Sequence, residues 1–473
     1  MPDAPLLKLN IDTDGSSALF QQIYDELRLR IVTRQLAPGE RLPPTRKLAD
    51  ELAISRTTIV TAYDQLIAEG FVESRAGSGV YVSDIGEVEL LPKNIPLADA
   101  SYLPMPLQTG AGPFSPGQPD MRLFPYQQWA RCVARVARKD AKALVLSSDP
   151  FGNTDLRIEI CRYLSEWRGI KAVPQQILIT AGSGEALELC IRSLTNPGDT
   201  IALENPGYPP LYAFANSLGL NISAMEVDDQ GATLPAPASN IHVPKLAILT
   251  PSSQYPLGGS MPQSRRYEFL AWAEASNSWI IEDDYDSEFR YAGRPYPALA
   301  SLSSRDRTLY IGSFSKIFSN GIRMGFVVLP QILIPKLDKT IRLYGSKASI
   351  MPQQPLAYFM KSGEFYRHIR RVRRIYSERR QALIKLLETN LGNIATFDDH
   401  HAGMQIAINL PTKYNDMQLS RIALSKGIFC PPLSSYYTSA HSQNGLLLGF
   451  CGFTVEEMQT AMETLKDTIQ EMA

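Results

Sequence analysis

Residues 41–82 read RLPPTRKLADELAISRTTIVTAYDQLIAEGFVESRAGSGVYV, a stretch punctuated by helix caps and turn residues. Thr45 is an N-cap candidate for the helical segment RKLADELA, and Ser55 is a second one for RTTIVTAYDQLIAEG, which Gly70 ends. The segment after Gly70, FVESRAGSGVYV, predicts a hairpin around a Gly-rich turn. Two short helices joined by a tight turn and followed by a hairpin predict a winged helix-turn-helix.

Residues 19–35 come before this stretch and form an amphipathic helical pattern, with apolar residues four apart at Leu19, Ile23, Leu27 and Ile31. In a winged helix-turn-helix, the second helix of the motif enters the major groove with its N-terminal residues. Arginine can bind guanine bidentately, threonine can meet a base edge or a phosphate, and wing glycines let the backbone approach the sugar-phosphate. The predicted DNA-contacting residues are Arg46, Arg56, Thr57, Thr58, Thr61, Arg75 and Gly77.

The charge of this region leaves an alternative open. Residues 15–82 hold eight Lys or Arg and eight Asp or Glu, and helix-turn-helix shapes also serve as protein-interaction modules. Placement favours DNA, because Arg46, Arg56 and Arg75 fall on the predicted DNA face while Asp64 and Glu69 fall elsewhere.

The whole chain has 473 residues, too many for one ordinary domain, and a formal net charge of -1. That charge excludes a protein that coats DNA by bulk charge, and a hydrophobic content of 44% excludes a wholly disordered chain. The five cysteines form no C-x-x-C pair, and neither a signal peptide nor a run of 18 apolar residues is present. We therefore expect a cytoplasmic protein with reduced thiols and no membrane partner.

Three parts are predicted along the chain. Residues 13–82 form the winged helix-turn-helix, residues 83–113 are a Pro-, Gly- and Ala-rich linker, and residues 114–473 alternate helices with short apolar strands. That alternation predicts an α/β domain with a mixed, mostly parallel sheet, whose ligands bind at the carboxyl ends of the strands. The predicted strands are 177–180, 200–204, 245–250, 278–284, 308–314 and 326–330.

The segment IGSFSKIFSNGIRMG, residues 311–325, places a lysine among small residues at the end of a strand. Lys316 could form a Schiff base with an aldehyde if desolvation or nearby positive charge lowers its pKa. Ser313, Ser315 and Arg323 are suitable phosphate ligands. A lone lysine is more often an ordinary surface residue.

Acidic residues crowd the end of the strand at 278–284, in SWIIEDDYDSEFRY. One carboxylate among Glu282, Asp283, Asp284 and Asp286 could be held against a protonated pyridine nitrogen, which keeps such a ring an electron sink. The alternative is that these are the acids of a surface loop.

Two further turns follow predicted strands. Ser183 and Gly184 lie at a Gly/Ser turn that opens a helix, where free N–H groups bind anions. Tyr208 lies on a Pro/Gly-bounded turn, where an aromatic ring could stack on a flat cofactor. Taken singly, a G-S-G turn and a loop tyrosine are more often structural.

Taken together, these motifs resemble a known family. Residues 41–82 are similar to the GntR family of bacterial regulators, and residues 110–470 resemble the fold-type I aminotransferases, including the segments FSPGQPDMRLFPYQQW and TPSSQYPLGG. The joint arrangement resembles the MocR/GabR-type transcriptional regulators. It implies a large mixed-sheet domain, a small α+β C-terminal subdomain, a homodimer and bound pyridoxal 5'-phosphate.

The resemblance also implies a role for each site residue. Lys316 would hold pyridoxal phosphate through a Schiff base, Asp283 would pair with the pyridine nitrogen, and Tyr285 would pair with the ring hydroxyl. Tyr208 would stack on the ring. The phosphate would be bound by Ser183, Gly184, Ser313, Ser315 and Arg323.

The sequence departs from working aminotransferases where these keep an arginine for the substrate carboxylate. Leu447 stands at that position, and Pro210 stands where the GABA-responsive member has an arginine. A pocket without these arginines cannot clamp an α-carboxylate bidentately in the usual way. We therefore expect a DNA-binding regulator rather than an enzyme, with an amine, an amino acid or pyridoxal phosphate itself as effector. The alternatives are an active aminotransferase with an attached DNA-binding head, or a structural protein in which Lys316 is idle.

Two other features complete the analysis. RHIRRVRRIYSERR, residues 367–380, holds seven arginines and could touch DNA, but the apolar spacing of Ile369, Val372 and Tyr376 favours a helix with a solvated basic face. His400 and His401 have no carboxylate or Cys at ligand spacing, so no metal site is predicted.

Overall fold

The computed structural model of the chain describes residues 9, 11–12, 17–86, 112–146, 149–235, 243–293, 296–302, 307–438 and 442–472. The chain divides into two compact units, residues 1–107 and 108–473. Most of the predicted linker, residues 87–111, lies outside the described residues. No helix within the described ranges combines the length and the apolar character needed to cross a membrane.

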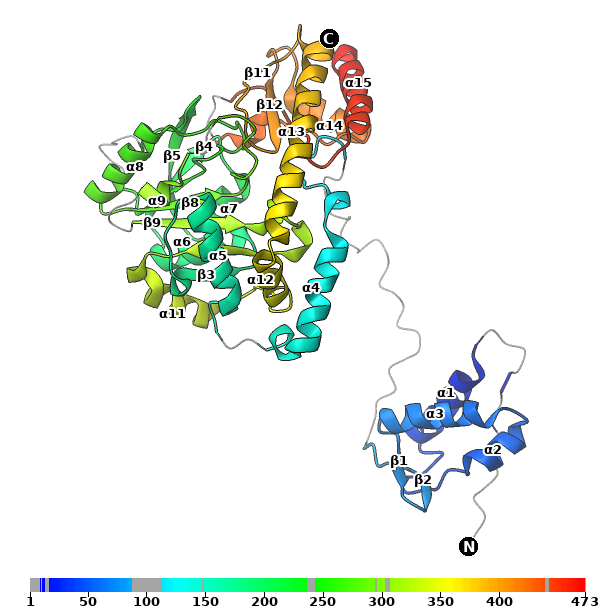
Figure 1. The fold of residues 1–473 in the computed structure, drawn as a ribbon. Helices are drawn as coiled ribbons and strands as arrows, with labels where there is room; N and C mark the ends of the chain where they lie inside the picture. Colours follow the sequence, from blue (N-terminus) through cyan, green and yellow to red (C-terminus); the bar gives the residue numbers. More distant parts are fainter. Residues whose placement is uncertain are drawn as a thin grey trace. The chain divides into compact units, whose positions relative to one another are not determined.

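The described residues of the small unit form three helices and one hairpin, drawn in blue in Figure 1. Buried apolar side chains of all three helices, among them Ile23, Ile59 and Leu66, form its core, together with Val72 and Val82 of the hairpin. The predicted winged helix-turn-helix is therefore present in these elements. Their bounds are α1 (Leu19–Val32), α2 (Thr45–Leu52), α3 (Arg56–Ala68), β1 (Val72–Arg75) and β2 (Gly79–Val82).

One predicted cap in the small unit is correct and one is wrong. Ser55 caps α3 by accepting a hydrogen bond from the Thr57 N–H at 3.2 Å. Thr45, in contrast, is the first helical residue of α2, and Pro44 occupies the cap position without a side-chain hydrogen bond. The carbonyl of Pro44 already accepts from the Leu48 N–H, so the helix begins one residue earlier than the threonine cap required.

The large unit is built on a sheet that, within the described residues, has eight strands in the order β3-β10-β9-β8-β7-β4-β5-β6. Neighbouring strands from β9 through β8, β7 and β4 to β5 run parallel, while β10 is antiparallel to both of its neighbours. All six predicted strands are present. Their bounds, with the two unpredicted strands, are β3 (Ile177–Thr180), β4 (Thr200–Asn205), β5 (Asn221–Asp228), β6 (Gly231–Ala232), β7 (Leu246–Leu249), β8 (Trp279–Asp284), β9 (Thr308–Ser313) and β10 (Gly325–Val328).

Helices cover this sheet, and the long helix α13 leads from it to a smaller C-terminal subdomain (Figure 1). The subdomain has a three-stranded antiparallel sheet in the described residues, β11-β12-β13, packed with α14 and α15. Its strands are β11 (Thr396–Phe397), β12 (Gln405–Asn409) and β13 (Gly445–Gly449). The helices of the large unit are α4 (Tyr126–Lys139), α5 (Thr154–Trp167), α6 (Ser183–Leu194), α7 (Pro209–Ser217), α8 (Gln263–Ala275), α9 (Leu299–Leu302), α10 (Phe314–Ile317), α11 (Ile334–Tyr344), α12 (Gln353–Lys361), α13 (Glu364–Leu391), α14 (Asp416–Ser425) and α15 (Val455–Glu471).

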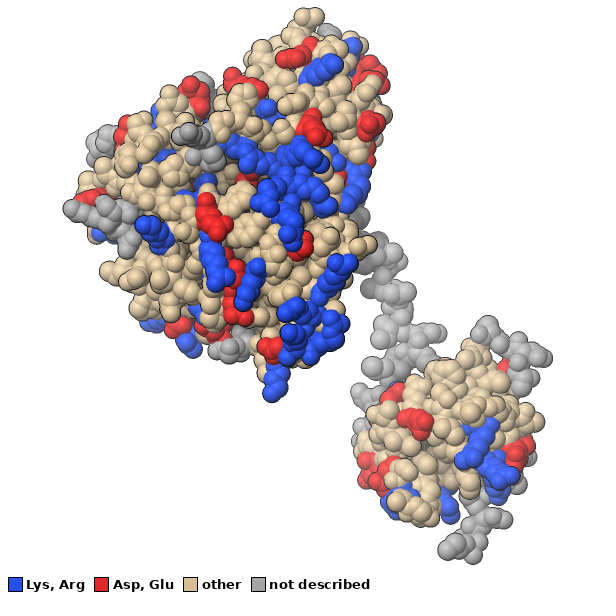
Figure 2. Space-filling model, in the orientation of Figure 1, with Lys and Arg blue, Asp and Glu red and all other residues tan. Residues whose placement is uncertain are grey.

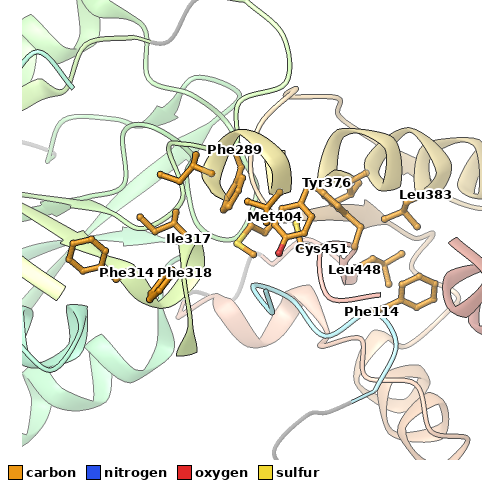
Figure 3. Close-up of a cluster of buried hydrophobic side chains, with 14 of the residues drawn as sticks. Phe114, Phe289, Phe314, Ile317, Phe318, Tyr376, Leu383, Met404, Leu448 and Cys451 are labelled. Carbon is orange, nitrogen blue, oxygen red and sulfur yellow. The ribbon is translucent and has the colours of Figure 1, made fainter. Parts of the chain in front are cut away.

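One hydrophobic core joins the sheet domain to the subdomain. Figure 3 shows Phe314, Ile317 and Phe318, just after β9, in line with Tyr376 of α13 and Leu448 of β13. These side chains are almost fully buried. Shared apolar packing of this kind fixes the segment after β9 against both parts of the large unit.

Candidate functional site

The carboxyl end of β9 carries Lys316 in the short helix α10. Its Nζ donates a hydrogen bond to the Gly117 carbonyl, 2.7 Å away and 199 residues earlier in the chain. A Cβ added to Gly117, whose φ is 62°, would lie 2.8 Å from that Nζ, so only glycine lets the backbone approach the amine so closely. Burial lowers the pKa of Lys316, and the charge of Asp286 opposes that shift.

The alternation of β8 separates the crowded acidic residues. Asp284 forms an ion pair with Arg168 at 2.7 Å and accepts from the Tyr310 hydroxyl at 2.6 Å. Glu282 lies 3.6 Å from Arg266 and accepts from two backbone N–H groups, those of Leu299 and Ala300. Both carboxylates are buried and partnered, so the surface-loop interpretation of this stretch is wrong.

Asp283 points to the opposite face of the strand, and its Oδ1 is shielded from solvent without a hydrogen-bond partner. Burial, with the negative charges of Asp284 and Glu204, raises the pKa of Asp283 to about 7. Its charge in turn acts on Tyr208, whose pKa is raised first by burial and then by Asp283. A positively charged N–H donor would satisfy the unpartnered oxygen of such a buried carboxylate.

Four tyrosines line the same region of the unit. Tyr255 contacts the rings of Tyr208, Tyr285 and Tyr436 edge to face, with centroids 5.5–6.0 Å apart. The Tyr285 hydroxyl donates to the Ser253 carbonyl at 3.1 Å. Tyr208, at the start of α7, is 48% exposed, so one face of its ring is open to a flat ligand.

The predicted phosphate ligands follow β3 and β9, two strands that β10 separates in the sheet. Ser183 and Gly184 begin α6, whose cap residue Gly182 has a φ of 101°, and a Cβ added to Gly182 would lie 3.9 Å from the Ser315 Oγ. Ser313 caps α10 by accepting from the Ser315 N–H at 3.2 Å. The helix N-terminus and these hydroxyls form a small polar cradle suited to an anion.

Arg323, the remaining predicted phosphate ligand, has no contact with this cradle among the described residues, whereas Glu185 lies at the start of α6. Arg323 is exposed and has a φ of 44°, beside an apolar hollow of about 470 Å³ lined by Phe124, Trp129 and Met351. Glu185, in the first turn of α6, accepts from the Ala181 and Lys347 backbone N–H groups at 2.5 and 2.7 Å. These two backbone N–H groups therefore hold the Glu185 carboxylate at the N-terminus of α6.

Apolar residues stand at the two positions where the sequence analysis noted that an arginine of related proteins is missing. Leu447, in β13, is fully buried and packs in a cluster with Leu433 and Tyr436, against Tyr255. Pro210 lies in the first turn of α7. Neither position offers a cation to the pocket.

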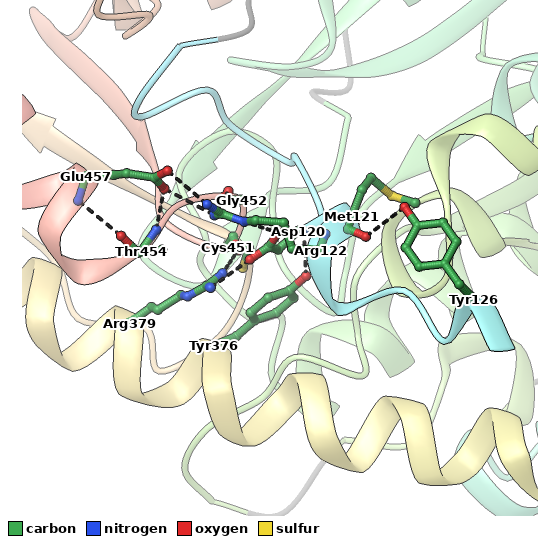
Figure 4. Close-up of polar contacts among 10 residues, drawn as sticks. All are labelled: Asp120, Met121, Arg122, Tyr126, Tyr376, Arg379, Cys451, Gly452, Thr454 and Glu457. Atoms are coloured by element: carbon green, nitrogen blue, oxygen red, sulfur yellow. Dashed lines mark hydrogen bonds and ion pairs between the residues drawn. The ribbon is translucent and has the colours of Figure 1, made fainter. Parts of the chain in front are cut away.

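Figure 4 shows how the segment that contains Gly117 is fastened. Asp120 forms an ion pair with Arg379 of α13 at 2.7 Å, and its N–H donates to the Tyr376 hydroxyl at 2.9 Å. Arg122 bridges Asp120 and Glu457 of α15 at 2.8 and 2.9 Å. The segment is therefore held to both α13 and α15.

The arginine-rich part of α13 is only partly a solvated face. Ile369, Val372 and Tyr376 are buried, as predicted, and blue side chains concentrate over α13 in Figure 2. Arg379 and Arg380 contradict the prediction, because both are buried and paired, with Asp120 and Asp399. The exposed arginines are Arg367, Arg370, Arg371 and Arg374.

In the small unit, the predicted DNA-contacting residues lie at the first turns of α2 and α3 and on the hairpin. Arg46, Arg56, Thr57 and Thr61 are exposed, and Thr58 is half-buried. The Nε of Arg56 is 3.4 Å from the Thr45 Oγ1, which connects the two helices. Arg75 lies over the ring of Tyr81 at 4.5 Å, and Gly77 has a φ of 71° with open space around it.

Sequence reasoning missed several residues of the site. Gly117 and Ser253 lie in motifs that the sequence analysis quoted only for resemblance, and Tyr436 carried no signal of its own. Asp286 was one of four acids that the sequence could not tell apart. Only the alternation along the strand and the tertiary contacts distinguish them.

Known protein families match both units of the chain. Residues 115–465 match the aminotransferase class I and II family, and residues 19–82 match the gntR family of bacterial regulatory proteins. The chain is 33% identical over 470 residues to the probable rhizopine catabolism regulatory protein MocR of Rhizobium meliloti, covering 97% of this chain and 95% of that protein. It is 32% identical to the pyridoxine biosynthesis transcriptional regulator PdxR of Corynebacterium glutamicum, covering 98% of each.

The large unit is also similar to solved structures of aminotransferases. The kynurenine aminotransferase of Pyrococcus horikoshii superimposes with a TM-score of 0.70 at 26% identity, over 76% of this chain and 90% of that one.

Proposed function

This chain is a transcriptional regulator of the MocR/GabR type and belongs to the aminotransferase class I and II family, and from this premise we propose that its large unit senses a small molecule through bound pyridoxal 5'-phosphate. The proposed sensor is the pocket around Lys316, and the proposed output is a change in DNA binding by the winged helix-turn-helix. An amine, an amino acid or pyridoxal phosphate itself is the effector.

The observation that carries this proposal is that Asp283 and Lys316 lie at the carboxyl ends of two neighbouring strands, β8 and β9. Asp283 has a shielded oxygen without a partner, which suits the protonated pyridine nitrogen of the cofactor. Lys316 is a primary amine whose pKa burial lowers, as nucleophilic attack on an aldehyde requires. When bound, pyridoxal phosphate supplies that aldehyde.

The other residues fit the same ligand. Tyr208 would lie against the ring, and Tyr285 would face its hydroxyl. The phosphate would be bound by the cradle of Ser183, Gly184, Ser313 and Ser315, with Arg323 at its exposed side. Together, a surface for the ring, an amine for the aldehyde and a site for the phosphate support the binding of pyridoxal phosphate. Any one of them alone would support it less.

The nature of the effector follows from what surrounds Lys316. Leu447 and Pro210 leave the pocket without the two arginines that would clamp a carboxylate, so an α-amino acid would gain little from its carboxylate here. This favours an amine, or pyridoxal phosphate itself. The second choice agrees with the name of the relative PdxR, a regulator of pyridoxine biosynthesis.

DNA binding would require two small units on paired half-sites, as helix-turn-helix dimers do. We propose that the large unit forms a homodimer that presents them. Large apolar side chains exposed on this unit support such a contact, among them Val145, Leu146, Leu343 and Met351.

An active aminotransferase with a DNA-binding head is the second candidate. The presence of Lys316 and Asp283 favours it, and the buried leucine at position 447 weighs against efficient turnover. Rapid conversion of bound cofactor to its amine form by common amino acids would favour the enzyme.

The test is an absorbance titration of the full chain with pyridoxal phosphate. Wild-type protein should keep a visible absorbance band after gel filtration, and Lys316→Ala should be colourless because the variant lacks the amine that the proposal bonds to the cofactor. Lys361→Ala, which removes an exposed lysine from the end of α12, serves as the matched control and should stay coloured. Equal colour in Lys316→Ala and wild type would refute the assignment.

A further inference from the structure

Three helices of the large unit concentrate positive charge. α4 has four basic residues and no acidic one, and α12 has Lys361 and no acidic one. Residues 364–374, which form the first part of α13, have five arginines and one glutamate. The whole chain is close to neutral, with a formal net charge of -1. These three segments therefore differ strongly from the average of the chain.

The three helices adjoin one another. α12 packs against both α4 and α13. The Arg135 guanidinium of α4 lies 4.3 Å from the ring centre of Tyr358 in α12, and the Arg371 guanidinium of α13 donates to the Leu123 carbonyl, just before α4. Figure 2 shows blue side chains over both α13 and α4 on the face turned to the viewer. We call the exposed basic side chains of α4, α12 and residues 364–374 the basic surface.

Within the basic surface, like charges lie close together. Arg131 and Arg135 are four residues apart in α4, and Arg370 and Arg374 have the same spacing in α13. Residues at this spacing share one face of a helix, and like charges there destabilise it. Arg131, Arg370 and Arg374 are exposed and have neither an ion pair nor a hydrogen bond in the described part of the chain. No carboxylate of the described chain therefore offsets their repulsion.

The neighbouring helix α5 differs in this respect. It also packs against α12, but it carries acidic and basic residues in turn and pairs Glu159 with Arg162. A helix face that contacts only solvent usually mixes both signs of charge in this way. The basic surface does not, so its charge fits a negatively charged partner better than solvent alone.

We propose that the basic surface binds the phosphate backbone of double-stranded DNA beside the sequence recognised by the winged helix-turn-helix. The inference rests on the DNA-binding part of the proposed function and needs no cofactor. Duplex DNA carries about one negative charge per 1.7 Å of its axis, and guanidinium groups bind phosphate bidentately. Such contacts add affinity without reading the base sequence.

The charge of the small unit supports this division of roles. Residues 15–82 have eight basic and eight acidic residues, so this unit as a whole attracts DNA weakly through bulk charge. The electrostatic part of DNA binding would then come largely from the large unit. The small unit would select the sequence, and the unit proposed to sense the effector would hold the flanking backbone.

The full-chain variant Arg131→Gln/Arg370→Gln/Arg374→Gln tests this, because glutamine favours helix and removes the charge. The DNA is a sequence selected by the wild-type protein, extended on each side by about two helical turns, or roughly 20 base pairs. Fluorescence anisotropy over a salt series gives the slope of log K against log salt concentration. The slope should become shallower by about one per lost phosphate contact, hence by about three.

The matched control is Lys336→Gln/Lys339→Gln/Arg421→Gln. It removes the same charge from exposed positions of α11 and α14, and its salt slope should stay that of wild type. An equal change in both variants would mean that net charge sets the slope, which overturns the proposal. An unchanged slope in the first variant also overturns it, even if that variant loses binding to vesicles of anionic lipid or to an acidic protein.

A second measurement varies the length of the DNA at fixed salt. Wild-type protein should bind the extended duplex more tightly than a duplex trimmed to the selected sequence, and the first variant should bind both about equally. The same gain from the extension in both proteins contradicts the proposal. If the wild-type protein selects no sequence, the proposed role of the winged helix-turn-helix fails, and the salt slope on any long duplex still decides the role of the basic surface.

Discussion

Neighbouring residues at the end of β8 have opposite environments because strand side chains alternate. Asp284 is neutralised by Arg168 on one face, while Asp283 faces the pocket with a shielded oxygen and a pKa near 7 because it is buried beside other carboxylates. One peptide unit therefore separates a structural ion pair from the acid that we propose binds the cofactor.

At the same scale, Arg56 is exposed in the first turn of α3, where a major-groove helix reads bases. Arg56→Ala should weaken binding to a DNA sequence selected by the wild-type protein by about 1–3 kcal/mol, the value of one bidentate contact to a base. Fluorescence anisotropy at fixed salt measures this. Arg30→Ala, which removes the same charge from the Glu26–Arg30 pair in α1, should bind nearly normally. Equal losses in both variants would mean that Arg56 contributes only bulk charge.

At the scale of elements, the start of α3 depends on one side chain. Ser55→Ala removes the acceptor for the Thr57 N–H and should lower the free energy of unfolding of the small unit by about 1 kcal/mol. Ser55→Asn, which retains a capping oxygen, should unfold close to wild type. Urea unfolding followed by circular dichroism compares the three proteins, and an unchanged midpoint for Ser55→Ala would show that the cap contributes nothing.

Elements with a continuous apolar run could be predicted from the sequence, and others could not. β3, β4 and β7 are buried at every residue and stood out as short apolar stretches. β5 is mostly exposed or half-exposed, so it lacked such a run and was not predicted. The Thr45 cap failed because a neighbouring proline already occupied the cap position.

The residues of the candidate site also divide into those that the sequence could predict and those that it could not. Lys316 and Asp283 could be chosen from motifs that lie within one strand end each. Gly117 could not, because its contact with Lys316 spans 199 residues and depends on the folded segment between Phe114 and Asp120. Asp286 could not be separated from its neighbours without knowing which of them had partners.

At the scale of the whole molecule, two compact units predict two unfolding events. Calorimetry should resolve them, and Ser55→Ala identifies the transition of the small unit because only that one moves. Pyridoxal phosphate at about 100 times its Kd should stabilise the other transition alone, by about 2.7 kcal/mol. Inorganic phosphate at the same concentration is the control. A single transition, or an equal shift of both, would contradict the independence of the units.

The hydrogen bond between Lys316 and Gly117 also connects two parts of the large unit that are far apart in the sequence. Gly117 is five residues from Gly112, the first described residue of the large unit, and the carbonyls of Pro113 and Phe114 are anchored by the N–H groups of Phe429 and Gly449. Five residues span at most about 17 Å of main chain. The carbonyl that accepts from Lys316 is thus part of the short, anchored segment with which the described part of the large unit begins. Through this hydrogen bond, Lys316 lies much closer to the start of the large unit than the 199 intervening residues suggest.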